Sequence, residues 1–232
     1  MHIYTIPEKL SCIIFDIDST LYTHAEYALE QVDIQIRHFA KLRNIAAEEA
    51  RELIGAFRRA QEKETGKKIS LGNTLTHFGI PITESIKWRE NLIEPALFLC
   101  KDPLLISTLE ILASNYTLIA VTNNPVLPAK KTLDVLGVSH FFLALIGLDT
   151  TGVSKPHELP FMEATKKAET TAAQCLSVGD RYDIDIDLPL KLGMGGILVD
   201  GVEDVYRLPE ILSKYKGNRL ESFILIQAPG IL

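Results

Sequence analysis

The sequence predicts an α/β fold in which helices cover both faces of a parallel sheet and a helical domain interrupts the chain. Two observations support this prediction. After residue 101, short continuous apolar runs alternate with helical patterns, as in parallel strands joined by crossover helices. Before that point a single apolar run, Cys12-Ile13-Ile14-Phe15, precedes a long block that contains no convincing strand. We therefore expect this first core strand to pair with strands that follow the inserted block.

The inserted block, residues 23–97, shows helical periodicity. A first helix would bury an apolar stripe with three- to four-residue spacing, made of Ala25, Leu29, Val32, Ile36 and Phe39. A second stripe, followed by Gly66, consists of Ala50, Leu53, Ile54, Phe57 and Ala60. Shorter helical pieces follow at 71–78 and 85–93. The core would then comprise residues 1–22 and 98–232, and the linkers at 21–23 and 98–102 would act as hinges.

The core resumes with a helix that Asp102 caps and that has Pro103 at its first position. Strands are expected at 117–121, 143–146, 175–178 and 196–199. Helical segments alternate with them: one ends at Gly137, and the others cover 161–168, 188–192, which Asp187 would cap, and 208–215. The apolar tail at 222–232 fits an edge strand, a packed arm or a partner-binding segment.

The composition of the 232-residue chain excludes several classes of protein. A net charge of −6 argues against nucleic-acid coating, so an anionic substrate needs positive charge supplied locally. The three cysteines are sparse and form no CxxC pair, which favours a reducing compartment, and Cys12 and Cys175 should be buried thiols. We see no signal peptide and no apolar run of transmembrane length. A cytoplasmic protein without a membrane partner is expected, and its oligomeric state is left open.

Polar side chains follow four of the predicted strands, at the carboxyl ends where open α/β sheets bind ligands. They place carboxylates, a hydroxyl, an amide and an ammonium at one edge of one sheet. In chain order these residues are Asp16, Asp18, Thr122, Asn123, Lys155, Asp180, Asp183 and Asp185.

This combination is typical of phosphoryl transfer. Crowded carboxylates repel one another, and a hard divalent cation such as Mg²⁺ relieves that repulsion. Thr122 and Lys155 would bind the phosphoryl oxygens, with Asn123 as a further substrate contact. Asp16 or Asp18 would attack phosphorus and form an aspartyl-phosphate. The other would protonate the leaving oxygen and later deprotonate the attacking water.

The chain resembles the haloacid dehalogenase superfamily of phosphohydrolases in four motifs that occur in order. The motifs frame nearly the whole chain, and each stands at a strand end, which makes the resemblance specific. They are Asp16-Ile17-Asp18-Ser19-Thr20, Ala120-Val121-Thr122-Asn123, Ser154-Lys155-Pro156 and Val178-Gly179-Asp180-Arg181-Tyr182-Asp183-Ile184-Asp185.

The resemblance implies a Rossmann-like three-layer core with an all-helical cap between the first and second motifs. It also implies individual roles. Asp16 would be the nucleophile and a Mg²⁺ ligand. Asp18 would be the acid/base and would offer its backbone carbonyl to the metal, and Asp180 would ligate the metal directly.

Some assignments have alternatives. Asp185 fits the motif spacing and would orient Lys155 or a metal-bound water, whereas Asp183 competes for that role. His24 follows the first motif and either contacts the substrate or lies in an exposed loop. Tyr22 either faces the substrate or packs inside the protein.

The presence of Asp18 argues against a dehalogenase, because an acid is needed there to protonate an alcohol leaving group. A looser similarity to pyrimidine 5′-nucleotidase-like members rests on 15–22 and on Gly72-Asn73-Thr74-Leu75. We predict a Mg²⁺-dependent phosphatase for a small phosphorylated metabolite, such as a nucleoside 5′-monophosphate or a sugar phosphate. A phosphomutase or phosphotransferase with the same intermediate is the alternative, and a non-catalytic binding protein is disfavoured.

Overall fold

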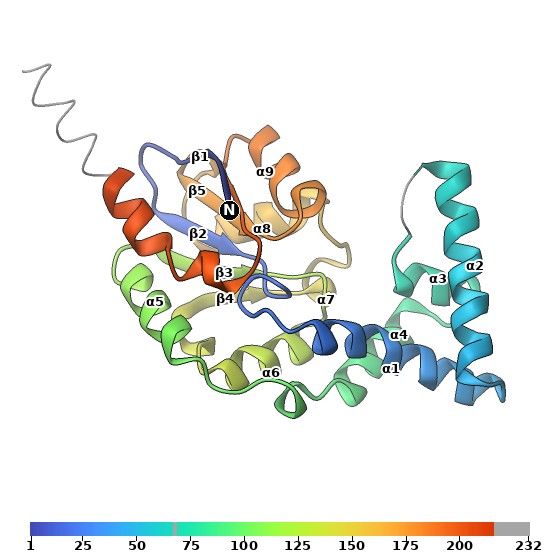
Figure 1. Cartoon of the computed structure of the whole chain (residues 1–232). Coiled ribbons are helices and arrows are strands. Elements are labelled where there is room, and N and C mark those ends of the chain that lie inside the picture. Colours follow the sequence, from blue (N-terminus) through green and yellow to red (C-terminus); the bar gives the residue numbers. More distant parts are fainter. Residues whose placement is uncertain (67–68, 216–232) are drawn as a thin grey trace, which may run out of the picture.

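The computed structural model describes residues 1–66 and 69–215, and its centre is a six-stranded sheet (Figure 1). The strand order is β1-β6-β5-β2-β3-β4, and only β1 runs antiparallel to its neighbour. The strands are β1 (His2–Thr5), β2 (Cys12–Phe15), β3 (Thr117–Val121), β4 (Phe142–Ile146), β5 (Cys175–Gly179) and β6 (Gly195–Leu198). The first core strand, β2, therefore lies between β3 and β5, as the sequence predicts.

Helices precede, connect and follow these strands. Those of the insertion are α1 (Ala25–Arg43), α2 (Ala47–Thr65), α3 (Leu71–His77), α4 (Ile82–Leu92) and the 3₁₀ turn η1 (Pro95–Leu97). Those of the core are α5 (Pro103–Ala113), α6 (Val126–Leu136), η2 (Ser139–Phe141), α7 (Leu148–Thr151), α8 (Glu158–Lys167), η3 (Ala172–Gln174), the π-helix η4 (Tyr182–Ile186), α9 (Asp187–Lys191) and α10 (Val202–Val205). Residues 208–215 are also helical.

Two apolar layers cover the two faces of the sheet. On β2, Ile13 and Phe15 point into the layer formed with α5, α6 and α10, whereas Cys12 and Ile14 point into the layer formed with α8. Every residue of β2 is buried, which explains its continuous apolar sequence. The predicted α/β fold with a parallel sheet covered on both faces is confirmed.

The inserted helices form a cap with a hydrophobic core of its own. Figure 1 shows α2 and α3 away from the sheet, whereas α1 and α4 lead back toward it. The cap core consists of Ile36, Phe39, Ala40, Ala50, Ile54, Leu75 and Trp88. The first turn of α1 differs, because Tyr27 packs into the core layer beside α6. The boundaries at 22/23 and 97/98 remain a prediction.

The buried face of α1 matches the predicted apolar stripe only in its second half, where Ile36 and Phe39 are buried. Leu29 is 70% exposed and Val32 is 40% exposed, so this part of the prediction was wrong. Tyr27, Gln31 and Gln35 are buried in their place. Two glutamines thus lie on the inner face of the helix, and their partners are at the candidate site described below.

Other differences concern chain ends and caps. The sequence did not predict β1, which extends the sheet beyond β6. The prediction that Asp187 caps a helix was wrong: Asp187 is the first residue of α9, follows directly on η4, and pairs with Lys191. The predicted cap at Asp102 is confirmed, as are the ends at Gly66 and Gly137.

Two predictions on composition can also be compared with the structure. Cys12 and Cys175 are buried free thiols, as expected. No helix within the described parts of the chain combines the length and apolar character needed to cross a membrane. The tail at 222–232 lies outside the described residues.

Candidate active site

The parallel strands bring the predicted site residues to one edge of the sheet. Asp16 follows β2, and its backbone N–H donates to Val178 O on β5 at 2.9 Å. Thr122 follows β3, and its N–H donates to Ile146 O on β4 at 2.9 Å. Asp180 follows β5. Because the strands are parallel and in register, their carboxyl ends coincide, and side chains distant in sequence become neighbours.

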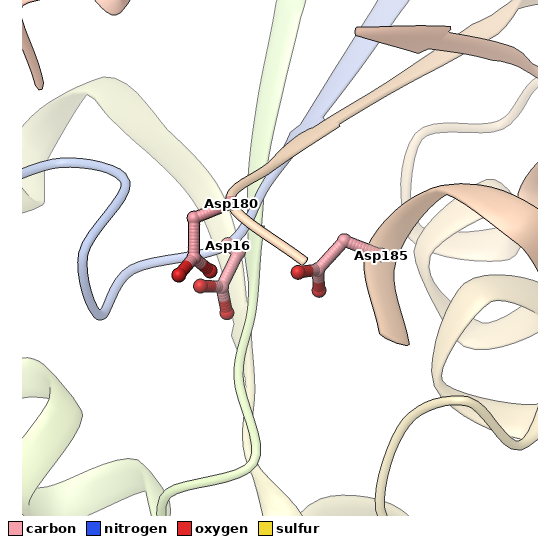
Figure 2. A group of neighbouring side chains, drawn as sticks. All are labelled: Asp16, Asp180 and Asp185. Carbon is pink, nitrogen blue, oxygen red and sulfur yellow. The ribbon is translucent and has the colours of Figure 1, made fainter. Parts of the chain in front are cut away.

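Three carboxylates and one ammonium form the centre of this edge. Asp16, Asp180 and Asp185 each place a carboxylate oxygen within 4.8 Å of the others, and Figure 2 shows the three side chains converging. Lys155 Nζ donates to Asp16 Oδ1 at 2.7 Å and to Asp185 Oδ1 at 2.6 Å. The Lys155 ammonium therefore pairs directly with two of the three carboxylates.

The electrostatics show an excess of negative charge in this cluster. Burial raises the pKa of Asp16 to about 8, and repulsion from Asp185 and Asp18 adds to this against the attraction of Lys155. Burial and repulsion from Asp185 raise the pKa of Asp180 to about 6. Burial alone would lower the pKa of Lys155, but Asp16 and Asp185 raise it above its ordinary value. Lys155 is therefore a permanent cation.

The cluster fits a hard divalent cation. All its ligand atoms are carboxylate oxygens, which Mg²⁺ prefers over nitrogen or sulfur. A further positive charge among them would oppose the mutual repulsion that raises the pKa of Asp16 and Asp180.

The structure distinguishes Asp185 from Asp183. Asp185 is 2% exposed, contacts Lys155, and accepts a hydrogen bond from the Arg181 N–H at 3.1 Å. Asp183 is exposed and pairs with the Arg181 guanidinium at 3.0 Å. Gly179 permits the buried position of Asp185, because a Cβ on that glycine would lie 2.4 Å from the Asp185 Cβ.

Asp18 turns away from the carboxylate cluster and is held by four donors. Its Oδ1 accepts from Tyr22 OH at 2.5 Å and from Gln31 Nε2 at 2.9 Å. Its Oδ2 accepts from Asn124 Nδ2 at 2.9 Å and from Thr122 Oγ1 at 3.4 Å. Asp16 and Asp18 thus have different surroundings and can serve different chemical roles. Tyr22 is buried and touches the site through Asp18.

The loops after β3 and β4 are fastened to each other. Asn123 Nδ2 donates to Lys155 O at 3.1 Å, and Lys155 N donates to Asn123 Oδ1 at 2.7 Å. Both ends of the Asn123 amide are therefore engaged in positioning Lys155. These two hydrogen bonds give Asn123 a positioning role that requires no contact with the substrate.

His24 does not join this cluster of contacts. Its Nδ1 accepts a hydrogen bond from the Tyr27 N–H at 3.2 Å and caps α1, and its ring meets Phe98 edge-on. The structure gives it a capping role. The stretch Gly72-Asn73-Thr74-Leu75 lies in α3, where Thr74 and Leu75 are buried in the cap.

Sequence reasoning missed Gln31, Asn124 and Gly179. A signal existed for Gln31, because Tyr27, Gln31 and Gln35 are four residues apart and share one helical face. Gln31 also donates to Tyr22 OH at 2.9 Å and accepts from Asn124 Nδ2 at 2.8 Å. It therefore links the cap helix α1 to two of the other groups that hold Asp18, Tyr22 and Asn124.

Known proteins resemble this chain in sequence and fold. It is 36% identical over 72 residues to a phosphoglycolate phosphatase from Colwellia psychrerythraea, a match covering 31% of this chain and 32% of that protein. It is 29% identical to a glyceraldehyde 3-phosphate phosphatase from Methanopyrus kandleri, over 80% of this chain and 82% of that protein. A crystal structure of a HAD phosphatase from Thermococcus onnurineus has a TM-score of 0.60 at 18% identity, and the match covers 88% of this chain and 98% of that one.

The match to a family model extends over residues 10–190, from the strand before Asp16 to the helix after Asp185. It includes the cap and the strand ends and loops that carry Asp16, Thr122, Lys155 and Asp180. The predicted membership of a phosphohydrolase superfamily is thereby confirmed: the chain belongs to the haloacid dehalogenase-like hydrolase family.

Proposed function

We propose that this protein is a Mg²⁺-dependent phosphatase that hydrolyses a small phosphomonoester through an aspartyl-phosphate on Asp16. The convergence of Asp16, Asp180 and Asp185 around Lys155 carries the proposal. Asp16 and Asp180 would hold the ion, with the backbone carbonyl of Asp18. When bound, Mg²⁺ would screen the negative charges of the nucleophile and the phosphoryl group from each other.

Each side chain has a defined part in the reaction. An Asp16 oxygen bonds to phosphorus while the bond from phosphorus to the leaving oxygen breaks, and Asp18 gives that oxygen a proton. Asp18 then takes a proton from water as the water attacks phosphorus and the bond to Asp16 breaks. Inorganic phosphate leaves and both carboxyl groups return to their starting states. Thr122 and Lys155 bind the phosphoryl oxygens throughout.

The substrate is proposed to be a small metabolite. The sequence relatives are named for phosphoglycolate and for glyceraldehyde 3-phosphate, both short phosphorylated carbon chains. They support a small substrate, and we rank such compounds above the nucleoside monophosphates first considered. A cytoplasmic location stays a prediction.

The cap, residues 23–97, is proposed to hinge at 21–23 and 98–102 and to exclude water while Asp16 attacks. Its close contact with the site through Gln31 supports this proposal, because Gln31 belongs to α1 and bonds to Asp18.

The test is turnover of p-nitrophenyl phosphate by Asp16→Asn, with Asp183→Asn as the matched control. Asp16→Asn should lose roughly 1,000-fold or more of kcat, as expected for a nucleophile. Asp183→Asn removes an exposed carboxylate from η4, the segment that also carries Asp185, and should keep normal turnover. EDTA should stop the reaction and Mg²⁺ should restore it.

Three results would contradict the proposal. Wild-type rates in a folded Asp16→Asn variant would remove the nucleophile assignment. An isomerised sugar phosphate in place of inorganic phosphate would favour a mutase. No turnover of any phosphate ester by the wild-type protein would favour a binding protein.

A further inference from the structure

Arg89 brings a guanidinium from the cap to the catalytic edge. It lies on α4, and its Nη1 donates to the backbone carbonyl of Asn123 at 3.3 Å. Asn123 directly follows Thr122 and fastens the Lys155 loop. Arg89 therefore lies over the ends of β3 and β4, on the side of the site that the cap covers.

Among the residues that the structure describes, this guanidinium has no anionic partner. Within 1–66 and 69–215, Arg89 Nε is buried and has no hydrogen-bond acceptor, and none of the ion pairs includes Arg89. Burial lowers the pKa of Arg89, whereas the more distant carboxylates of Asp149 and Asp18 act in the opposite direction. A buried charge of this kind is costly unless an anion pairs with it. The missing partner is therefore negatively charged.

The phosphoryl group already has its own partners. Thr122 and Lys155 lie at the strand ends where that group would bind, whereas Arg89 comes from the cap. The part of a substrate that extends from phosphorus toward the cap is its leaving group. A planar guanidinium matches a carboxylate with two parallel hydrogen bonds.

We propose that Arg89 determines substrate specificity by binding a carboxylate on the leaving part of the phosphomonoester. This inference rests on the proposed phosphatase function and narrows its substrates to phosphorylated carboxylic acids. Neutral phosphate esters would leave the guanidinium without its partner and would bind more weakly.

The test compares phosphoglycolate with ethyl phosphate, which carries a methyl group in place of the carboxylate. The wild-type protein should prefer phosphoglycolate in kcat/KM. Arg89→Gln should lose about 10- to 100-fold on phosphoglycolate, mainly through KM, and little on ethyl phosphate, because a hydrogen bond to a charged group is lost. Arg89→Lys should restore part of the preference for phosphoglycolate, since lysine supplies a positive charge but not the two parallel N–H donors of a guanidinium. The matched control is Lys87→Gln, which removes an exposed cation from the same helix.

The outcomes separate this inference from the proposed function. Absence of wild-type turnover on both esters and on p-nitrophenyl phosphate would refute the phosphatase itself. Normal turnover with equal losses on both esters in Arg89→Gln, or with no loss, would refute the carboxylate role alone. If Arg89→Gln does not fold, Arg89→Lys and competition by both esters against p-nitrophenyl phosphate decide the same question. Equal inhibition constants for the two esters in the wild-type protein would then overturn the inference.

Discussion

Asp16 and Asp180 bind protons more tightly in the folded protein than their ordinary pKa of 3.8 allows. Their pKa values are raised to about 8 and about 6, first by burial and then by neighbouring carboxylates. Between these values and 3.8 the folded state holds protons that the unfolded state has released. The contribution of both groups to stability is therefore largest at low pH and is lost as the pH rises through 6 and 8.

This loss of stability with rising pH leads to a prediction for metal binding. At the proposed site Mg²⁺ would compete with protons for these carboxylates, so the rise in Tm caused by Mg²⁺ over EDTA should be larger at pH 8.5 than at pH 5.5. Thermal unfolding at both pH values measures it. Asp180→Asn should shrink the rise, whereas Asp183→Asn should leave it unchanged. An equal rise at both pH values would show that these carboxylates do not hold the ion.

At the scale of single residues, the sequence predicts which side chains follow strand ends. It does not predict which way a side chain points where that direction depends on a local turn. Asp16, Thr122 and Asp180 are visible because each follows a continuous apolar run. The choice of Asp185 over Asp183 depends on η4, whose π-helical turn directs one carboxylate inward and the other outward. The motif spacing favours Asp185, but the pattern of residue types does not predict this π-helical turn.

The helix α1 connects the cap to the acid/base candidate. Its inner face carries Gln31 and Gln35, and Gln35 Nε2 donates to Gln31 O at 2.7 Å. Gln31 in turn donates to Asp18 Oδ1 at 2.9 Å. Apolar periodicity could not place Gln31 and Gln35 on this face, because their side chains are polar and are buried only together with their hydrogen-bond partners.

Gln31→Leu should affect substrates according to their leaving group. An alkyl phosphate needs a proton from Asp18 as its oxygen departs, whereas p-nitrophenolate departs without one. We expect kcat/KM for the alkyl ester to fall about tenfold or more and that for p-nitrophenyl phosphate to change far less. The ratio of the two values is the measurement.

Gln35→Leu is the control, because this side chain lies one turn further along α1 and, within the described residues, its hydrogen bond goes to the backbone of Gln31. Its ratio should stay at the wild-type value. Parallel losses on both substrates in Gln31→Leu would indicate a general packing defect instead of a role at Asp18.

The short strand β1 illustrates the limits of sequence prediction for elements. Its four residues are all exposed, so neither apolar continuity nor alternation marks them. The strand exists because the edge of β6 offers unpaired backbone groups. The sequence predicts the other five strands: the four central ones are mostly buried, and the edge strand β4 still has a continuous apolar sequence.

The whole molecule contains separate hydrophobic cores. Leu75 is fully buried in the cap core, and Leu109 is fully buried beneath the sheet. Leu75→Ala and Leu109→Ala should each cost about 2–5 kcal/mol. Hydrogen exchange should locate the loss differently: Leu75→Ala should speed exchange in α2 and α3, and Leu109→Ala should speed it in β2 and β3.

This comparison also examines the domain division at 22/23 and 97/98. If Leu75→Ala accelerates exchange equally in the sheet and the cap, the two parts unfold together and the cap is not an independent unit.

The central position of β2 has a consequence for how the protein is made. Asp16 is translated before its partners, because Lys155 follows it by 139 positions and Asp185 comes 30 positions after that. Both neighbours of β2 are likewise translated long after it. A chain still emerging from the ribosome would thus carry Asp16, the proposed nucleophile, without the cation and carboxylates that surround it. Contacts this distant in sequence form slowly, and the chemistry would begin only after nearly the whole core has been translated and folded.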